Sequence, residues 1–540
     1  MNILNKLMRQ YSTISFFILC MVAFSLLLFS CGKDDPPEKE KEPEKEQEKE
    51  KEQEKTPELS SDKKITEFSF DTSVNSGLNR KLSGSISEGL SVITISTRDW
   101  IENIESLKPS FKVVAKGVKV NNIEQKSGET AQNFRKEVVY VVTAEDGTTK
   151  NYSVIFESPQ TSGLPTIKID TENRQSITSK ENYINANVDI YDPDNKAYCL
   201  KTTTEIRGRG NSTWGMPKKP YRLKFHSKTS LFGLPAEKSW ALLANYQDPT
   251  LIMNSVAFEL GHRLGLPFAN HYNHVELFLN GTYQGSYMLT EQVQVKSSRV
   301  NVSETEGFLV EIDQYYDEDP RFRTDILSLP IMIKSPDLVD YPGLDLTFVR
   351  ETINKFEAAM FDYTKGFPNN NYKELVDIDN VIDFIIINEL VRNVEVKHPK
   401  SIYMYKDKNK KIGFGPLWDF DWAFGFEDGW YSYFHLSKAE TMLMKPNYIW
   451  DGNVGHQFFC RFFDDPEFRA KYKARWNKLY ESQIATMDKF IDEMGNKLDK
   501  SQKQNFIIWG HQNYQSEIRG MISFWNERIK RLNTQINNFK

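Results

Sequence analysis

Residues 206–225 read IRGRGNSTWGMPKKPYRLKF, a glycine-rich turn followed at once by an alternating segment. In the second half, three apolar side chains alternate with Arg222 and Lys224. Successive side chains of a strand point to opposite faces, so this pattern predicts a strand with one apolar and one cationic face. We expect Lys224 to be presented from this rigid element, either to a phosphate group or as a solvated charge on an edge strand.

The glycine-rich half carries the residue types that hold phosphate groups. Glycines let the backbone approach a ligand, and basic and small polar side chains donate hydrogen bonds to it. The spacing from Gly210 to Gly215 resembles that of a P-loop, but Met216 and Pro217 stand where Lys and Ser or Thr are required. A phosphate site and a simple turn before a strand both remain open. The candidate phosphate ligands are Arg207, Arg209, Asn211, Ser212 and Lys218.

A second motif lies in residues 415–425, which read GPLWDFDWAFG. Asp419 and Asp421 are surrounded by aromatic residues, where carboxylates are costly unless they are paired or bind a metal. If the segment is a strand, both side chains point the same way and reach one site, as suits Mg²⁺. Alternatively, one aspartate caps a turn, or both pair with the arginines upstream.

Further carboxylates lie just before this motif. An apolar helix with an acidic N-cap is predicted over Asp379–Val394, and a strand over Ser401–Lys406. Asn388-Glu389 and Glu395 fall near the end of that helix. Either glutamate is a candidate for a general base or a further metal ligand.

Residues 166–540 mix strands and helices, so we assign this large domain to the α+β class. A helix is predicted over Pro249–Leu264, and a hairpin around Asn280-Gly281. Asp465-Pro466 indicates the start of another helix, and the last thirty residues form an amphipathic one. The domain is long enough to bury a core and hold a cleft.

Residues 65–158 consist of short β-rich runs with no helical period. Val138–Ala144 and Asn151–Phe156 flank Asp146-Gly147, a tight-turn signal that predicts a hairpin. Strands of this number and length suit a small all-β, immunoglobulin-like sandwich. We interpret it as a spacer, with carbohydrate or protein binding as the alternative.

The first 64 residues are predicted to form a targeting signal and a tether. Residues 1–31 combine Lys6 and Arg9 with an apolar stretch, which is typical of a signal peptide, and Leu28–Gly32 resembles a bacterial lipobox with Cys31 as the lipidated residue. An uncleaved membrane anchor is the alternative. Residues 32–64 contain nine lysines and thirteen acidic residues and read as a disordered spacer. We expect an exported protein, lipid-anchored to the bacterial outer membrane and exposed on its surface.

Composition excludes two classes. The chain has 540 residues and a net charge of -5, so it lacks the basic excess of a dedicated nucleic-acid binder. With four cysteines, it has no disulfide framework.

The motifs of the large domain, taken in order, resemble those of the spore-coat protein H (CotH) kinase family. They comprise residues 207–214, residues 218–224, Leu242–Tyr246, Gly285–Gln292 and Trp418–Asp421. The resemblance implies an atypical protein-kinase-like fold that uses ATP with Mg²⁺ or Mn²⁺ to phosphorylate a protein substrate, typically on serine.

The resemblance also assigns roles to individual residues. It implies that Asp419 or Asp421 binds the metal and that Lys224 and the loop from Arg207 to Ser212 hold phosphates. Many members show Asn-x-Asp after the long helix, where this chain has Glu395. A glutamate there displaces the carboxylate by one methylene, so weak or absent activity is part of the expectation.

The competing hypothesis is an inactive kinase-like adhesin or binding module. Its contact surface would be the aromatic stretch Trp430–Phe434, which suits stacking on a glycan or a protein. A zinc enzyme is disfavoured because no paired-cysteine or His-Glu-x-x-His pattern is present.

Overall fold

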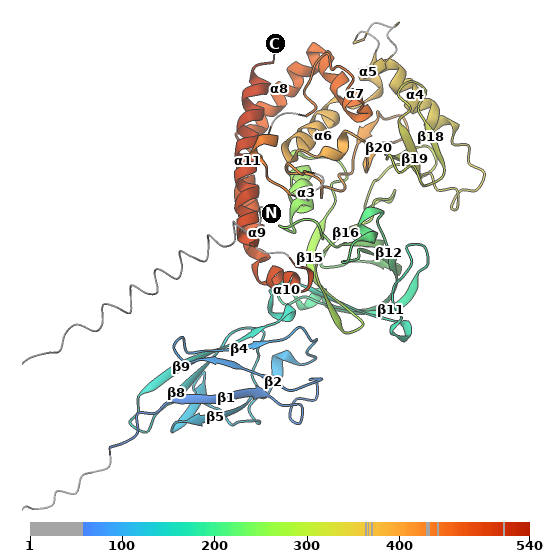
Figure 1. The fold of residues 1–540 in the computed structure, drawn as a ribbon. Helices are drawn as coiled ribbons and strands as arrows, with labels where there is room; N and C mark the ends of the chain where they lie inside the picture. The colour runs from blue at the N-terminus through green and yellow to red at the C-terminus, as the bar shows by residue number, and fades with distance from the viewer. Residues whose placement is uncertain are drawn as a thin grey trace, which may run out of the picture. The chain divides into compact units, whose positions relative to one another are not determined.

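The computed structural model describes residues 58–361, 364, 367–368, 371–427, 432–439, 442–510 and 513–539 (Figure 1). The predicted signal segment with Cys31, and the tether up to residue 57, lie outside these residues. Within the described part of the chain, no helix has the length and apolar character needed to cross a bilayer.

The N-terminal region is all β and contains two sheets around one apolar core. Its strands are β1 (Lys64–Phe70), β2 (Leu82–Ser83), β3 (Ser85–Ser87), β4 (Val92–Ser96), β5 (Ser110–Val114), β6 (Gly117–Val120), β7 (Ile123–Glu124), β8 (Val138–Thr143) and β9 (Thr149–Glu157). The sheet orders are β2-β1-β5 and β3-β4-β9-β8-β6-β7. Phe68, Phe70 and Tyr140 belong to the buried core. The predicted hairpin is confirmed, because β8 and β9 pair antiparallel and the Thr148 amide donates to Asp146 Oδ1 at 2.8 Å.

The large domain begins with a closed seven-stranded barrel. Its strands are β10 (Thr166–Thr171), β11 (Ile184–Tyr191), β12 (Leu200–Gly208), β13 (Tyr221–Thr229), β14 (Glu237–Leu243), β15 (Tyr272–Leu279) and β16 (Thr282–Glu291). Their order is β10-β11-β12-β13-β14-β16-β15, and a parallel β10–β15 pairing closes the ring. The predicted strand and hairpin are confirmed. Asn280 and Gly281 both have positive φ, 52° and 79°, as a two-residue hairpin turn requires.

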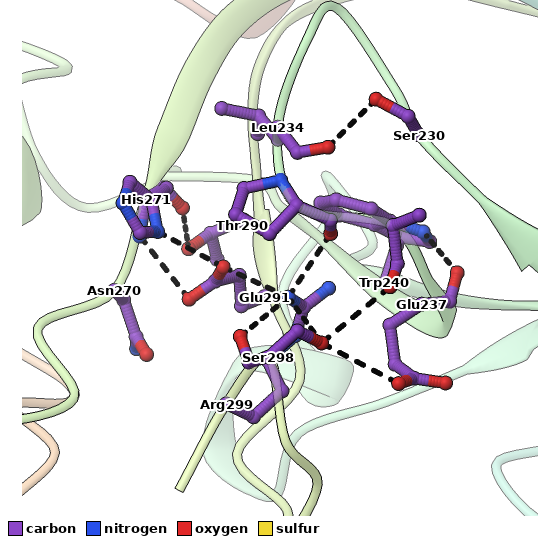
Figure 2. A network of polar contacts seen from close by, with 12 residues as sticks. Ser230, Leu234, Glu237, Trp240, Asn270, His271, Thr290, Glu291, Ser298 and Arg299 are labelled. Carbon is purple, nitrogen blue, oxygen red and sulfur yellow. Dashed lines mark hydrogen bonds and ion pairs between the residues drawn. The ribbon is translucent and has the colours of Figure 1, made fainter. Parts of the chain in front are cut away.

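An ion-pair network at the end of β16 fastens the following loop to the barrel (Figure 2). Glu291 Oε1 accepts from Arg299 Nη1 at 2.9 Å and from His271 Nδ1 at 3.0 Å. The Arg299 guanidinium lies 4.7 Å from the centre of the Trp240 ring. The hydrogen bond to Glu291 is the main cause that raises the pKa of His271, while partial burial and Arg299 oppose it.

Replacing His271 by asparagine should lower stability at acidic pH only. Because the pKa of His271 is higher in the folded protein, its contribution is complete below its ordinary pKa and is lost as pH rises through the folded value. His271 is half exposed, so solvent screening limits the loss to below about 1 kcal/mol. Urea unfolding at pH 5 and pH 9 measures it, with His226→Asn as the exposed control. An equal loss at both pH values would contradict the assignment.

A second sheet follows the barrel. Its strands are β17 (Phe308–Ile312), β18 (Arg321–Arg323), β19 (Pro330–Ser335), β20 (Ile402–Lys406) and β21 (Gly413–Phe414), in the order β18-β19-β17-β20-β21. The α-helices of the described chain are α3 (Met253–Leu264), α4 (Thr347–Phe361), α5 (Tyr372–Leu375), α6 (Ile378–Val391), α7 (Val454–Cys460), α8 (Pro466–Tyr480), α9 (Met487–Lys497), α10 (Asp499–Trp509) and α11 (Tyr514–Asn537). The long α11 runs along the helical side of the domain and contacts α6, α8 and α9 (Figure 1). The expected α+β class is confirmed.

Two helices begin or end differently from the prediction. Helix α3 starts later than predicted because Leu251 has a positive φ of 63° and the buried Asp248 carboxylate accepts the Met253 amide at 2.8 Å. Helix α6 ends earlier, because Arg392 adopts the left-handed conformation at φ 50°. The chain leaving α6 therefore forms the short turn η7 (Val394–Val396), which carries Glu395.

Glu389, a predicted base or ligand on α6, lies in the core instead. Its side chain and that of Arg528 from α11 are both fully buried, and Arg528 Nη2 lies 2.6 Å from Glu389 Oε2. The carboxylate also accepts the amides of Met442 and Met444 at 3.0 and 3.2 Å. Glu389 therefore has a structural role, because it connects α6 to α11 and to residues 442–444.

Candidate active site

A cavity of about 400 Å³ lies between the barrel and the second sheet. The loop after β12 and part of β13 line one side, and the ends of β17 and β20 line the other. Lys224 is not among its lining residues. Apart from the buried Glu389, the other predicted catalytic, metal and phosphate residues line it: Arg207, Arg209, Asn211, Ser212, Lys218, Glu395, Asp419 and Asp421.

Three carboxylates meet at one end of this cavity. Glu395, Asp419 and Asp421 each offer an oxygen, and these oxygens lie within 4.8 Å of one another. The side chain of Glu395 is buried, and its Oε2 has no hydrogen-bond partner in the described part of the protein. Three acidic groups this close repel one another when ionised.

Burial and mutual repulsion raise the pKa of two of these groups. Burial is the main cause that holds the pKa of Glu395 well above its ordinary range, and the charges of Asp419 and Asp421 add to it. Burial followed by the charge of Asp419 raises the pKa of Asp421 in the same way. A bound cation would relieve this repulsion, because it favours the ionised carboxylates.

The aspartates reach the cluster from an irregular segment and not from a strand, the case in which both were expected to reach one site. Residues 415–420 have no regular structure, and Asp419 has a positive φ of 61°. Two backbone hydrogen bonds fix the segment: Phe420 N donates to Asn254 Oδ1 on α3 at 3.0 Å, and Phe424 N donates to the carbonyl at the end of α6 at 2.6 Å. Aspartate tolerates the left-handed conformation better than most residues, and such strain commonly marks a functional position.

This donor set fits a hard divalent cation. Carboxylate oxygens are the ligands that Mg²⁺ and Mn²⁺ prefer, and two of these residues come from one short segment while the third comes from η7. The partnerless, buried Glu395 Oε2 is the observation that a bound cation or a polar ligand would explain.

Three arginines line the cavity as well. The guanidinium of Arg209 lies 5.1 Å from the centre of the Trp418 ring, and burial lowers its pKa while Asp419 opposes that shift. The Nε groups of Arg207 and Arg222 are buried and have no hydrogen-bond partner among the described residues. Guanidinium groups of this kind are suited to phosphate oxygens.

Two backbone amides of the glycine-rich loop are bonded within the protein. The amides of Gly208 and Arg209 donate to the carbonyls of Ser179 and Pro220, so they do not face the cavity. A Cβ at Gly208 would lie 2.4 Å from the Trp214 ring, so this glycine makes room for the indole. The side chains of Asn211 and Ser212 stay exposed at the rim, and Asn211 Oδ1 accepts from Lys180 at 3.0 Å.

Two predicted lysines do not present their amines to the cavity. Lys224 is exposed on β13, and its amine lies 5.5 Å from the centre of the Tyr183 ring. Arg222 occupies the same face two residues earlier, about 7 Å closer to the cavity end of the strand. Lys218 is buried and donates to Ser286 O and, at 2.9 Å, to Asn505 Oδ1, and burial lowers its pKa to about 7.

A partly buried ion pair on the second sheet was not predicted from the sequence. Lys334 on β19 lies 3.4 Å from Glu311 on β17, and both line the cavity. Burial raises the pKa of Glu311 to about 7. The available signal was one charge in each of two otherwise apolar strands, FLVEI and PIMIKS. Single charges of opposite sign in buried strands favour a pair between them.

The aromatic residues described in the stretch proposed as a binding surface are buried. Trp430 and Tyr431 lie outside the described residues. Tyr433 and Phe434 are buried, and Tyr433 packs against Phe426 at 5.3 Å between ring centres. The described part of this stretch therefore belongs to the core, which removes the main support for the adhesin hypothesis.

Both regions match models of known protein families. Residues 206–532 match a family model described as CotH kinase protein, and residues 65–155 match one described as SGBP, N-terminal. A search of curated proteins found no match. The first match includes every residue of the carboxylate and arginine groups described above.

Proposed function

The chain belongs to the CotH kinase protein family, and from that membership we propose that its large domain has an atypical kinase fold and transfers the terminal phosphoryl group of ATP to a protein hydroxyl, typically of serine. The observation that carries this proposal is the meeting of three carboxylates and three arginines in one cavity. A metal-bound nucleotide needs both kinds of group.

At the donor end, Arg207, Arg209 and Arg222 hold the phosphate oxygens. Asp419 and Asp421 are the residues that would bind Mg²⁺ or Mn²⁺. The cation, when bound, neutralises charge on the phosphate oxygens. The side chains position the reactants and stabilise the charge of the transition state, and no covalent intermediate with the protein is formed.

At the acceptor end, Glu395 orients the hydroxyl through Oε2, the oxygen that has no partner among the described residues. The hydroxyl oxygen bonds to the terminal phosphorus, the bond from that phosphorus to the ADP oxygen breaks, and the hydroxyl proton passes to the Glu395 carboxylate. A glutamate can perform this role, because the task requires a carboxylate within hydrogen-bond reach of the proton.

Arg209→Met should weaken binding of Mg-ATP, whereas Lys224→Met should not. Hydrogen bonds to charged groups contribute about 1.5–3 kcal/mol, so the first variant should lose roughly tenfold to a hundredfold in affinity. Methionine keeps the apolar stem of both side chains. Isothermal titration calorimetry of the purified protein measures the difference. An equal loss of affinity for Lys224→Met would show that Lys224 binds the phosphates, as the sequence predicted.

We also propose that Cys31 carries a lipid and holds the protein on the outer membrane, because Leu28–Gly32 resembles a lipobox and residues 32–64 read as a tether. Cells expressing the wild type should incorporate labelled palmitate into the protein and retain it in the membrane fraction. Cys31→Ser should lose both properties. Palmitate labelling of the variant, or none in the wild type, would refute the anchor.

A further inference from the structure

A second cavity, of about 550 Å³, adjoins the active site. Its lining comes from the segment that follows α6, from the turn after the two catalytic aspartates, and from Lys438. Glu395 and Lys400 line both cavities, so these two residues form the wall that separates them.

The second cavity carries an excess of positive charge. Four lining residues are cationic, and two are acidic: Arg392, Lys397, Lys400 and Lys438 face Glu395 and Glu427. Glu427 is paired with Lys438 at 3.0 Å, and Glu395 belongs to the carboxylate cluster of the first cavity. Lys397 makes no ion pair with any carboxylate in the described ranges of the chain, so its charge is available to an incoming anion.

The positive charges in this cavity also act on one another. An anionic ligand would offset the repulsion between these gathered cations.

The wall of this cavity also includes the partly exposed ring of Trp422, with the buried ring of Phe426 stacked on it. The rings of Trp422 and Phe426 stack with centres 5.1 Å apart and planes 13° apart. The amine of Lys400 lies 4.7 Å from the centre of the Trp422 ring. A partly exposed aromatic ring with cations around it suits a peptide that carries acidic side chains.

We propose that this second cavity admits the acceptor and selects a protein segment whose reactive hydroxyl is flanked by carboxylate side chains. The inference rests on the proposed phosphoryl transfer, and it adds the class of substrate. Because Glu395 faces both cavities, a hydroxyl that enters through the second one reaches Glu395 from the side opposite the nucleotide.

The test measures binding of two fluorescent peptides to the purified full-length protein. One has a serine flanked by glutamates, and the other has the same serine flanked by lysines. We expect the glutamate peptide to bind at least tenfold more tightly. Lys397→Glu should remove this preference and leave the affinity for Mg-ATP unchanged. The control is Lys489→Glu, which makes the same charge change at an exposed position on α9 and should keep the preference.

A second substitution, Lys397→Gln, keeps the test valid if the charge reversal disturbs folding, since it removes the charge with little change in size. Its peptide KM should rise severalfold while kcat stays within about twofold, as expected when an acceptor contact is lost without loss of chemistry.

Equal affinity for the two peptides, or a preference that survives both Lys397 variants, would overturn the inference. Mg-ATP binding without any peptide binding would overturn it too, but would leave the proposed kinase function standing. Failure to bind either Mg-ATP or peptide would reject both.

Discussion

Asp419→Ala and Asp421→Ala are each expected to reduce phosphoryl transfer by a factor of about a thousand or more. Each variant removes one of the three carboxylates that converge within 4.8 Å. Preorganised groups that stabilise charge in the transition state are worth factors of about 10²–10³ each, and loss of a metal ligand adds the loss of the cation's own contribution. Incorporation of the labelled terminal phosphoryl group of ATP into the protein and into a mixture of serine peptides measures the effect.

The matched control for these variants is Asp317→Ala. Asp317 also lines the cavity, but it is exposed at the rim and does not belong to the cluster. Its variant should keep activity within about threefold, since an exposed charge contributes little. Full labelling by the Asp421→Ala protein would show that the cluster is not the metal site.

Glu389→Gln is expected to lower the free energy of unfolding by about 3–5 kcal/mol, because it leaves the buried Arg528 charge uncompensated. Both side chains are fully buried. Burial is the main cause that lowers the pKa of Arg528 to about 10. The charge of Glu389 opposes this shift and so favours the charged guanidinium. Denaturant unfolding followed by tryptophan fluorescence measures the loss.

The control for the buried pair is Arg531→Gln on the same helix. Arg531 pairs with Glu527 at 2.6 Å on a partly exposed surface, and such a pair contributes below about 1 kcal/mol. The double variant Glu389→Met with Arg528→Met should recover part of the loss, because a buried apolar pair replaces an uncompensated charge. A loss for Glu389→Gln as small as that for Arg531→Gln would mean that the pair does not hold α6 and α11 together.

Local signals predicted several elements correctly because they depend on neighbouring residues only. Asn280-Gly281 predicted its hairpin from the turn chemistry that positive φ values require. Asp465 and Pro466 predicted the start of α8, where the Asp465 carboxylate accepts the Glu467 amide at 2.8 Å. The alternation in β13 correctly gave the two faces of that strand.

The errors concern distances between residues far apart in the chain. Alternation places Arg222 and Lys224 on one face of β13, but only the position of the second sheet decides which of them reaches the cavity. Likewise, Glu389 and Glu395 lie close together near the end of one helix. Glu389 pairs with Arg528, which lies 139 residues later in the chain, and this pair is buried in the core. Glu395 makes no such pair and lies in the carboxylate cluster.

The site segment itself shows why its secondary structure could not be predicted. Spacing at i and i+2 suggested a strand, yet Asp419 is held at a positive φ and Phe420 is fixed by Asn254 of α3. These contacts come from a helix more than 150 residues earlier, so no local pattern records them. The convergence of the two aspartates was nevertheless predicted, because both the strand and the irregular segment bring their side chains to one point.

The proposed function requires one cavity to hold a nucleotide between the arginines and a cation bound by Asp419 and Asp421. Calorimetric titration of the purified protein with ATP tests it most directly, with Mg²⁺ present, with EDTA present, and with the Asp421→Ala protein. We expect saturable binding in Mg²⁺ that weakens at least tenfold in EDTA and in the variant. Binding of equal strength under all three conditions, or no binding in Mg²⁺, would contradict it.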